Sequence, residues 1–128
     1  MKFWCATAFM DSRELIAVSQ MLDACGYDGL MVSDHLVYPQ KLESKYPYSP
    51  YPDGRPMWAP EAAWPDPWVL IGAMAAVTTQ LNFTTNIYVA PMRPLLQVAK
   101  EVSTASVISG GRVALGAGAG WKIGRAHV

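Results

Sequence analysis

Polar residues that could do chemistry stand at the ends of three short apolar runs in this sequence. The segment Ser33 to His35 follows one run, Asn86 interrupts a second, and glycines from Gly116 to Gly120 end a third. The carboxyl ends of neighbouring parallel strands gather at one edge of a sheet. If the three runs are such strands, these polar groups surround one shared pocket.

His35 could donate or accept a proton, because an imidazole titrates near neutral pH. Asp34 beside it could bias the protonation of the ring or fix its tautomer. The alternative is a histidine that is only hydrogen-bonded within a turn. His35 is therefore the candidate catalytic residue of the sequence.

The glycine run and Asn86 are candidates for contact with a bound group. Glycines allow the backbone to approach a phosphate or a flat ring, but the run lacks the GxGxxG spacing and the lysine of a phosphate loop. A tightly packed turn explains it equally well. Asn86 lies in an otherwise β-branched and aromatic run, where it marks either a bulge facing a ligand or a plain strand edge.

Residues 44–68 form a long segment with seven prolines and six aromatic residues and no usable period. Loops of this length in a compact domain are usually functional or disordered, and the aromatic content argues against disorder. We expect either a lid with flat apolar walls or an aromatic cover over the end of the sheet.

Three helices are expected between the apolar runs. Asp11 and Glu14 have the spacing of a capping box before the first helix, and Gly26 ends it. Asp66 caps the second, and Pro94 opens the third. The inward residues at helical spacing are Leu15, Val18, Leu22 and Cys25 in the first helix and Leu95, Val98, Val102 and Ala105 in the third.

Strands are expected within 2–8, 29–33, 81–89 and 112–116. Their alternation with helices predicts an α/β fold with a parallel sheet covered by helices.

The composition describes one globular domain of 128 residues, 52% hydrophobic and 16% charged. Ten basic and ten acidic residues balance, so no positive field favours nucleic acid or an anionic membrane. No apolar stretch reaches the roughly 18 residues of a membrane span, and we expect a cytoplasmic protein. Cys5 and Cys25 are expected as core residues, with a disulfide or metal role as the alternative, and no metal site is predicted.

Three segments together carry a resemblance to a known family: YDGLMVSDHLVYP from Tyr27, the stretch from Trp64 to Arg93, and VISGGRVALGAGAGW from Val107. In combination they resemble the bacterial luciferase-like monooxygenase superfamily, and most of all its coenzyme F420-dependent branch. The resemblance covers residues 1–121.

The resemblance implies the amino-terminal half of a (β/α)8 TIM barrel that binds F420, or alternatively FMN, at the carboxyl ends of its strands. It implies hydride transfer between this cofactor and a small organic substrate. His35 matches the family's proton-transfer histidine, and Asn86-Ile87 matches a cis peptide that backs the cofactor ring. The other implied cofactor contacts are Asp34, Gly116, Gly118, Ala119 and Gly120.

Trp121 stands where some sugar-phosphate dehydrogenases of this group have a glutamate. This difference favours a larger apolar substrate, walled by Tyr38, Trp58 and Trp64. The alternatives are an FMN-dependent monooxygenase, a flavin binder without catalysis and an inactive truncated domain. The full-length protein is expected to be a homo-oligomer.

Residues 122–128 do not resemble the family, and a common sequencing-adapter string encodes the peptide KIGRAHV. We expect a family domain over 1–121 followed by a non-native tail. Four strands cannot close an eight-stranded barrel, so an isolated chain is expected to be inactive.

Overall fold

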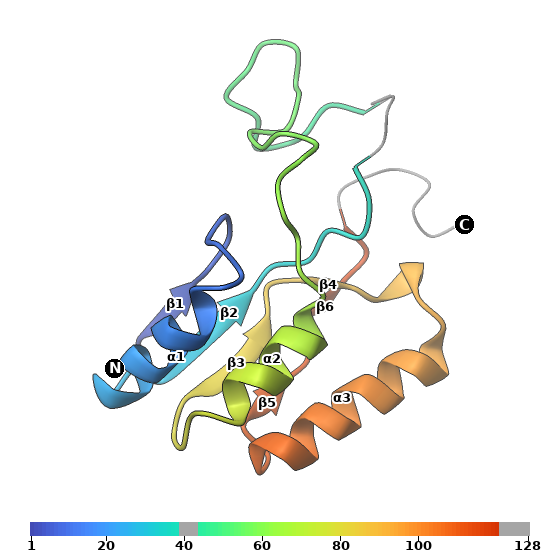
Figure 1. Ribbon diagram of the computed structural model, residues 1–128. Helices are drawn as coiled ribbons and strands as arrows, with labels where there is room; N and C mark the ends of the chain where they lie inside the picture. The colour runs from blue at the N-terminus through green and yellow to red at the C-terminus, as the bar shows by residue number, and fades with distance from the viewer. Residues whose placement is uncertain (39–43, 121–128) are drawn as a thin grey trace.

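The computed structural model describes residues 1–38 and 44–120 of the chain. A four-stranded sheet contains β1 (Trp4–Ala6), β2 (Gly29–Val32), β3 (Asn82–Thr85) and β5 (Val113–Ala114), in that order across the sheet. Each strand runs parallel to its neighbour (Figure 1). The predicted α/β fold with a parallel sheet is confirmed.

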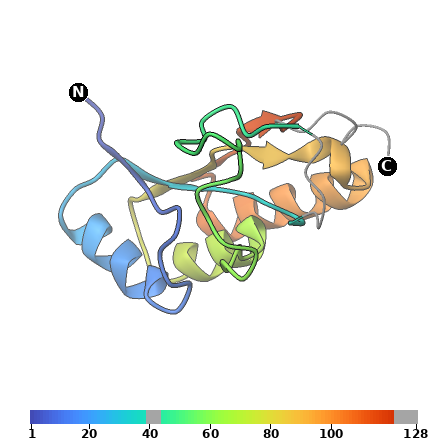
Figure 2. The ribbon, with the colours of Figure 1, turned by 90° about the horizontal axis from the view of Figure 1, so that it is seen from above.

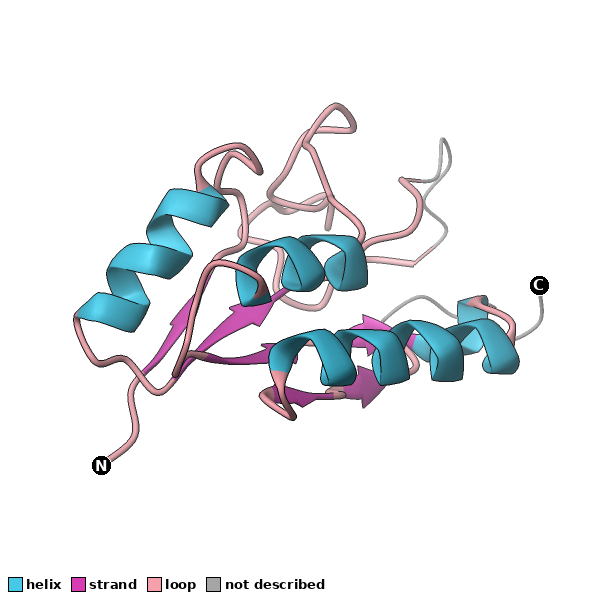
Figure 3. Ribbon diagram, turned by 60° about the horizontal axis from the view of Figure 1, so that its bottom comes forward, coloured by secondary structure: helices cyan, strands magenta, loops and turns pink. Residues whose placement is uncertain are grey.

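Three helices connect the strands and lie on one face of the sheet (Figures 2 and 3). They are α1 (Leu15–Ala24), α2 (Pro67–Ala75) and α3 (Leu95–Ser109). The core lies between this face and the helices, because one row of paired strand residues points toward them. That row consists of Cys5, Leu30, Phe83 and Val113, and it packs with buried helix residues that include Leu15, Leu22, Leu70, Ile71, Met74, Val98 and Ala105.

The predicted cap of α2 is confirmed, but the predicted capping box of α1 is wrong. The Asp66 side chain accepts hydrogen bonds from the backbone N–H groups of Trp68 and Val69, at 2.9 and 3.0 Å. Asp11 instead accepts from the backbone N–H of Arg13. In a capping box the Asp11 side chain would accept a hydrogen bond from the backbone N–H of Glu14. That N–H instead donates to the backbone carbonyl of Asp11 within a turn.

Two residues expected on inward helix faces are exposed. Cys25 is the residue at which α1 ends, so it follows the part of the helix that packs on the sheet. Leu95 begins α3, where the helix extends beyond α2 (Figures 1 and 3), and its side chain is 79% exposed. Cys5 is half-buried against the core, and both cysteines are free thiols.

The third predicted strand is interrupted at Asn86, so of the two readings of this residue, a bulge or a plain strand edge, the structure supports the irregularity. β3 ends at Thr85, the Asn86–Ile87 peptide is cis as the resemblance implied, and β4 (Tyr88–Val89) continues into a short 3-10 turn, η1 (Ala90–Met92). The fourth strand, predicted over 112–116, ends earlier in the structure, where β5 stops at Ala114, and a further strand, β6 (Ala117–Gly118), forms within the glycine run. β4 and β6 pair in parallel and form a second, two-stranded sheet, separate from the four-stranded one.

Two half-buried charged side chains, those of Asp23 and Arg112, bind the turns at the amino end of the sheet. Asp23 accepts hydrogen bonds from the backbone N–H groups of Thr79, Gln80 and Leu81, at 2.8, 2.8 and 2.6 Å. The Arg112 guanidinium donates to the hydroxyl of Thr78 and to the carbonyls of Ala75, Thr78, Leu81 and Ser109. These bonds fix the turns from which β3 and β5 begin.

Candidate active site

A pocket of about 470 Å³ lies at the opposite, carboxyl end of the sheet, beneath the aromatic loop. Its size is within the range of small-molecule and cofactor sites. It brings together seven of the residues predicted from the sequence: Asp34, His35, Trp58, Trp64, Asn86, Ile87 and Gly120.

His35 is half-buried in the wall of this pocket and lies between two tryptophans. The imidazole centroid is 4.6 Å from the ring centroid of Trp58 and 4.4 Å from that of Trp64. The indoles restrict where the imidazole can move. His35 therefore has both the chemistry and the fixed position that proton transfer requires.

Phe9 completes the aromatic wall, although the sequence analysis did not single it out. Its ring centroid is 6.0 Å from that of Trp58 and 5.5 Å from that of Trp64. Its backbone has φ of 68°, a left-handed conformation uncommon for a residue other than glycine. Phe9 follows the end of β1. The carboxyl ends of parallel strands gather at one edge of the sheet, so this rule could have pointed to Phe9 as well.

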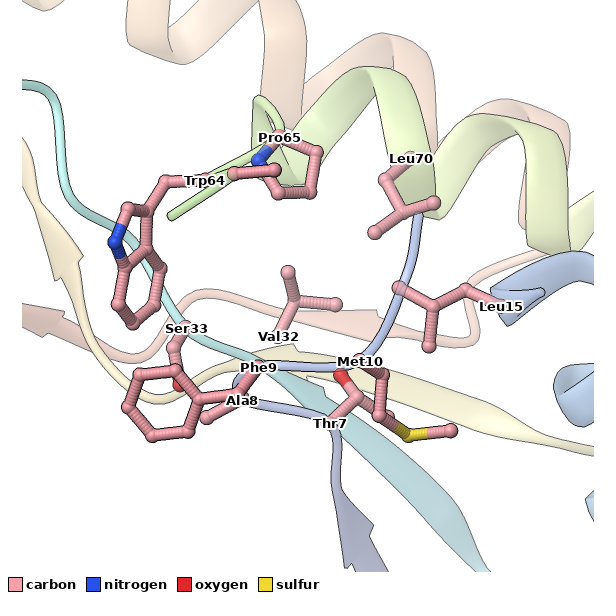
Figure 4. A pocket seen from close by; sticks show the side chains of 11 residues that line it. Thr7, Ala8, Phe9, Met10, Leu15, Val32, Ser33, Trp64, Pro65 and Leu70 are labelled. Carbon is pink, nitrogen blue, oxygen red and sulfur yellow. The ribbon is translucent and has the colours of Figure 1, made fainter. Parts of the chain in front are cut away.

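A second, much smaller cavity lies behind this wall (Figure 4). Its volume is about 10 Å³, about the space of one water molecule. In Figure 4 the rings of Trp64 and Phe9 stand at one end of the hollow and Leu15 and Leu70 at the other. Phe9 and Trp64 therefore separate the apolar interior from the larger pocket.

Asp34 is held by an ion pair that the sequence analysis did not predict. Its carboxylate accepts two hydrogen bonds from the Arg93 guanidinium, at 2.7 and 2.8 Å, and a third from the backbone N–H of Val89, at 2.9 Å. The Asp34 side chain is only 2% exposed, and the Arg93 side chain only 8%. Burial acts to lower the pKa of Arg93, but its hydrogen bonds to Asp34 raise that pKa above its usual value.

Tyr88 supports Arg93 from the other side. The guanidinium carbon lies 4.2 Å from the centre of the Tyr88 ring, and the Tyr88 hydroxyl donates to a Glu101 carboxylate oxygen at 3.1 Å. Burial raises the pKa of Tyr88 to about 12, although the charge of Arg93 acts to lower it. The phenol therefore stays neutral and donates this hydrogen bond at physiological pH.

Gly116 and Gly118 allow the chain to pack closely against the segment from Thr85 to Ile87. An added Cβ at Gly116 would lie 2.0 Å from the carbonyl oxygen of Thr85, and one at Gly118 would lie 2.2 Å from Cδ1 of Ile87. The backbone N–H of Gly116 donates to the Thr85 hydroxyl at 3.0 Å. Their cofactor contacts, like that of the exposed Ala119, stay predictions, whereas Gly120 lines the pocket.

Tyr38 does not line the main pocket. It borders an adjoining hollow of about 210 Å³, which shares His35, Trp58 and Trp64 with that pocket. Trp121 and the predicted tail 122–128 lie outside the described residues. The pocket also contains Ser33, from the predicted strand end, and Tyr46, Tyr48 and Met57, from the predicted aromatic loop. The pocket residues that sequence reasoning missed are Ala8, Phe9 and Val89.

The described residues contain neither a metal cluster nor a membrane-spanning helix. Among residues 1–38 and 44–120, no three His, Cys, Asp or Glu side chains are grouped so that they could hold a metal ion. Within the same ranges, no helix has the length and apolar character needed to cross a membrane.

Two solved structures are similar to this fold. The oxygenating constituent of 3,6-diketocamphane monooxygenase from Pseudomonas putida, a type II Baeyer-Villiger monooxygenase in complex with FMN, has a TM-score of 0.70 and 22% identity over 95% of this chain and 30% of its own. Monooxygenase RslO1 from Streptomyces bottropensis has a TM-score of 0.63 and 20% identity over 91% of this chain and 32% of its own. The four parallel strands and their helices thus match part of the luciferase-like TIM barrel.

Sequence relatives come from Mycobacterium tuberculosis strain H37Rv. The uncharacterized protein Rv0940c is 35% identical over 118 residues, which are 92% of this chain and 40% of the relative. The uncharacterized protein Rv0953c is 30% identical over 109 residues, or 83% of this chain and 37% of the relative. The chain spans about two fifths of the length of these relatives. Residues 4–123 match the family profile, so the chain belongs to the luciferase-like monooxygenase family.

Proposed function

We propose that this chain carries the ring-binding and proton-transfer part of an oxidoreductase that uses coenzyme F420, with FMN as the second candidate cofactor. The observation that carries the proposal is the single pocket in which His35, the Asn86–Ile87 peptide and Gly120 meet. These groups come from three strand ends that are far apart in the sequence.

The residues of the pocket fit a flat, tricyclic cofactor ring. Phe9, Trp58 and Trp64 supply planar apolar surface, and the volume of about 470 Å³ is ample for such a ring. The wall also contains a buried donor, Nε1 of Trp64, for which the described residues provide no hydrogen-bond partner. Unpaired buried donors are costly, so an acceptor on a bound molecule would stabilise this one.

The side chains of this chain have separate tasks in the proposed reaction. When bound, F420 or FMN supplies the centre that accepts or gives a hydride. The Asn86–Ile87 peptide and Gly120 would hold the ring, and the aromatic wall would exclude water from it. His35 would hold or deliver a proton at an imidazole nitrogen as the substrate changes charge.

F420 and FMN are supported by different observations. The combined motifs around His35, Asn86 and Gly118 resemble the F420-dependent branch. The similar structure from Pseudomonas putida was solved with FMN. For the substrate we propose an apolar organic molecule, because Trp58 and Trp64 face the same pocket as His35.

Replacing His35 tests the proposal. In the full-length protein, we expect His35→Ala to lower turnover by about 10²- to 10⁴-fold, the usual contribution of proton transfer, while cofactor affinity changes little. Turnover is followed by the absorbance of the cofactor, and affinity by titration with F420 and FMN separately. Arg13→Ala, which changes an exposed ion pair outside the pocket, provides the control. Unchanged turnover in His35→Ala would remove His35 from the mechanism, and binding of neither cofactor by the unmodified protein would contradict the proposed function.

A further inference from the structure

We propose that Arg93 is a positioning residue that acts through Asp34 to hold His35 opposite the Asn86–Ile87 peptide. The inference rests on the proposed role of His35 and adds a residue to which the resemblance gave no task. Arg93 is absent from the lining of the pocket, so its effect must pass through the residues that it holds.

The ion pair joins the two chain segments that carry the polar groups of the pocket. Asp34 immediately precedes His35, and Val89 lies two residues after Ile87. Within the sheet, the last connection between these segments is the hydrogen bond from the backbone N–H of Asn86 to the carbonyl of Val32, at 2.8 Å. Beyond that point, the Asp34 carboxylate links them through Val89 and Arg93.

The guanidinium group is specifically suited to this position. Its two terminal nitrogens reach both oxygens of Asp34, and one also donates to the Val89 carbonyl at 3.3 Å. Its flat face stacks on Tyr88, whose hydroxyl is tied to Glu101 of α3. A lysine keeps the charge but loses both the forked contact and the stacking.

Asp34 is thereby given a structural task different from a proton relay. The three hydrogen bonds that reach its carboxylate from Val89 and Arg93 occupy both oxygens. A carboxylate fixed in this way sets the direction in which the chain leaves β2. His35 follows at once, and its ring then enters the space between Trp58 and Trp64.

The test compares Arg93→Lys and Arg93→Ala with Arg13→Ala, which removes the arginine of an exposed ion pair. The first readout is the NMR signal of the His35 ring protons in the protein without cofactor. Ring currents of Trp58 and Trp64 shift this signal, so it reports the position of the imidazole. The His35→Gln variant identifies the signal, because the sequence has two histidines.

We expect both Arg93 variants to move the His35 signal toward the value of an unstructured histidine, and Arg13→Ala to leave it in place. In the second readout, made on the full-length protein, turnover should fall about 100-fold in Arg93→Ala and about tenfold in Arg93→Lys, because small displacements of a reacting group have effects of this size. The cofactor dissociation constant should change less than about threefold.

An unmoved His35 signal in folded Arg93→Lys would overturn the proposal, as would turnover that falls only in proportion to the folded fraction. Arg93→Lys retains the charge, so it decides the question even if Arg93→Ala does not fold. If the unmodified protein binds neither F420 nor FMN, the proposed function fails, while the NMR comparison still tests the positioning role.

Discussion

At the amino end of the sheet Arg112 fixes the turns from which strands begin, whereas at the carboxyl end Arg93 supports a pocket. Arg112 donates all its hydrogen bonds to carbonyls and a hydroxyl of neighbouring turns. Arg93 pairs with the carboxylate beside His35. Similar side chains therefore hold turns together at one end and stand beside the proposed site at the other, in line with the usual separation of stability and function between the two ends of parallel strands.

The largest effect on stability is expected at Arg112. Arg112→Ala leaves buried carbonyls without a donor, so we expect the free energy of unfolding to fall by about 3 kcal/mol, measured by denaturant titration. Arg13→Ala, the exposed control, should barely change it. The His35 NMR signal of folded Arg112→Ala should stay in place. Movement of that signal would contradict the separation between the two ends.

A glycine comparison examines the packing under the pocket. Gly116→Ala would place a methyl group 2.0 Å from a backbone oxygen, and we expect it to lower the free energy of unfolding by about 2 kcal/mol. Gly72→Ala is the matched control, because an added Cβ there meets no atom within 4 Å. In a helix interior this change should raise stability by roughly 0.5–1 kcal/mol. Equal effects in both variants would show that Gly116 is not tightly packed.

Stability should also depend on the charge of Asp23. Burial acts to raise the pKa of Asp23, but the hydrogen bonds from Thr79, Gln80 and Leu81 together lower it below the ordinary value of 3.8. Because the folded state favours the ionised form, this contribution is complete above the pKa of the unfolded chain and is lost as the pH falls through the lower, folded value.

Asp23→Asn should therefore reduce the free energy of unfolding by about 1 kcal/mol near neutral pH and weaken its acid dependence below about pH 4. Denaturant titrations across this range measure the change. Asp53→Asn in the exposed loop is the control. An acid dependence as steep as that of the unmodified protein would show that the Asp23 carboxylate does not stabilise the fold.

The features that could be predicted from the sequence are those that depend on neighbouring residues or on the order of the strands. Asp66 with Pro67 marked the start of α2, and the polar Asn86 marked the point where the third strand is interrupted. The common direction of the strands then brought His35, Asn86 and Gly120 together. These features follow from local capping and from the topology of parallel sheets.

Features that depend on distant contacts were missed. Arg93 meets Asp34 across 59 positions of the chain, and no local pattern indicates such a pair. Leu95 has the spacing of an inward residue, but the end of α3 extends beyond its partner helix. Asp11 has the spacing of a capping box, but a turn uses the N–H that the box needs. For Arg93 and Leu95 the tertiary structure decided the outcome, whereas at Asp11 two local structures competed for the same backbone N–H.

The most direct test of the contrast between the two ends is an NMR titration of the labelled protein with F420 and, separately, with FMN. We expect at least one cofactor to shift the backbone signals of His35, Ile87 and Gly120 in a saturable manner and to leave those of Gln80 and Arg112 unchanged. Shifts confined to the amino end of the sheet, or saturation with neither cofactor, would contradict the account.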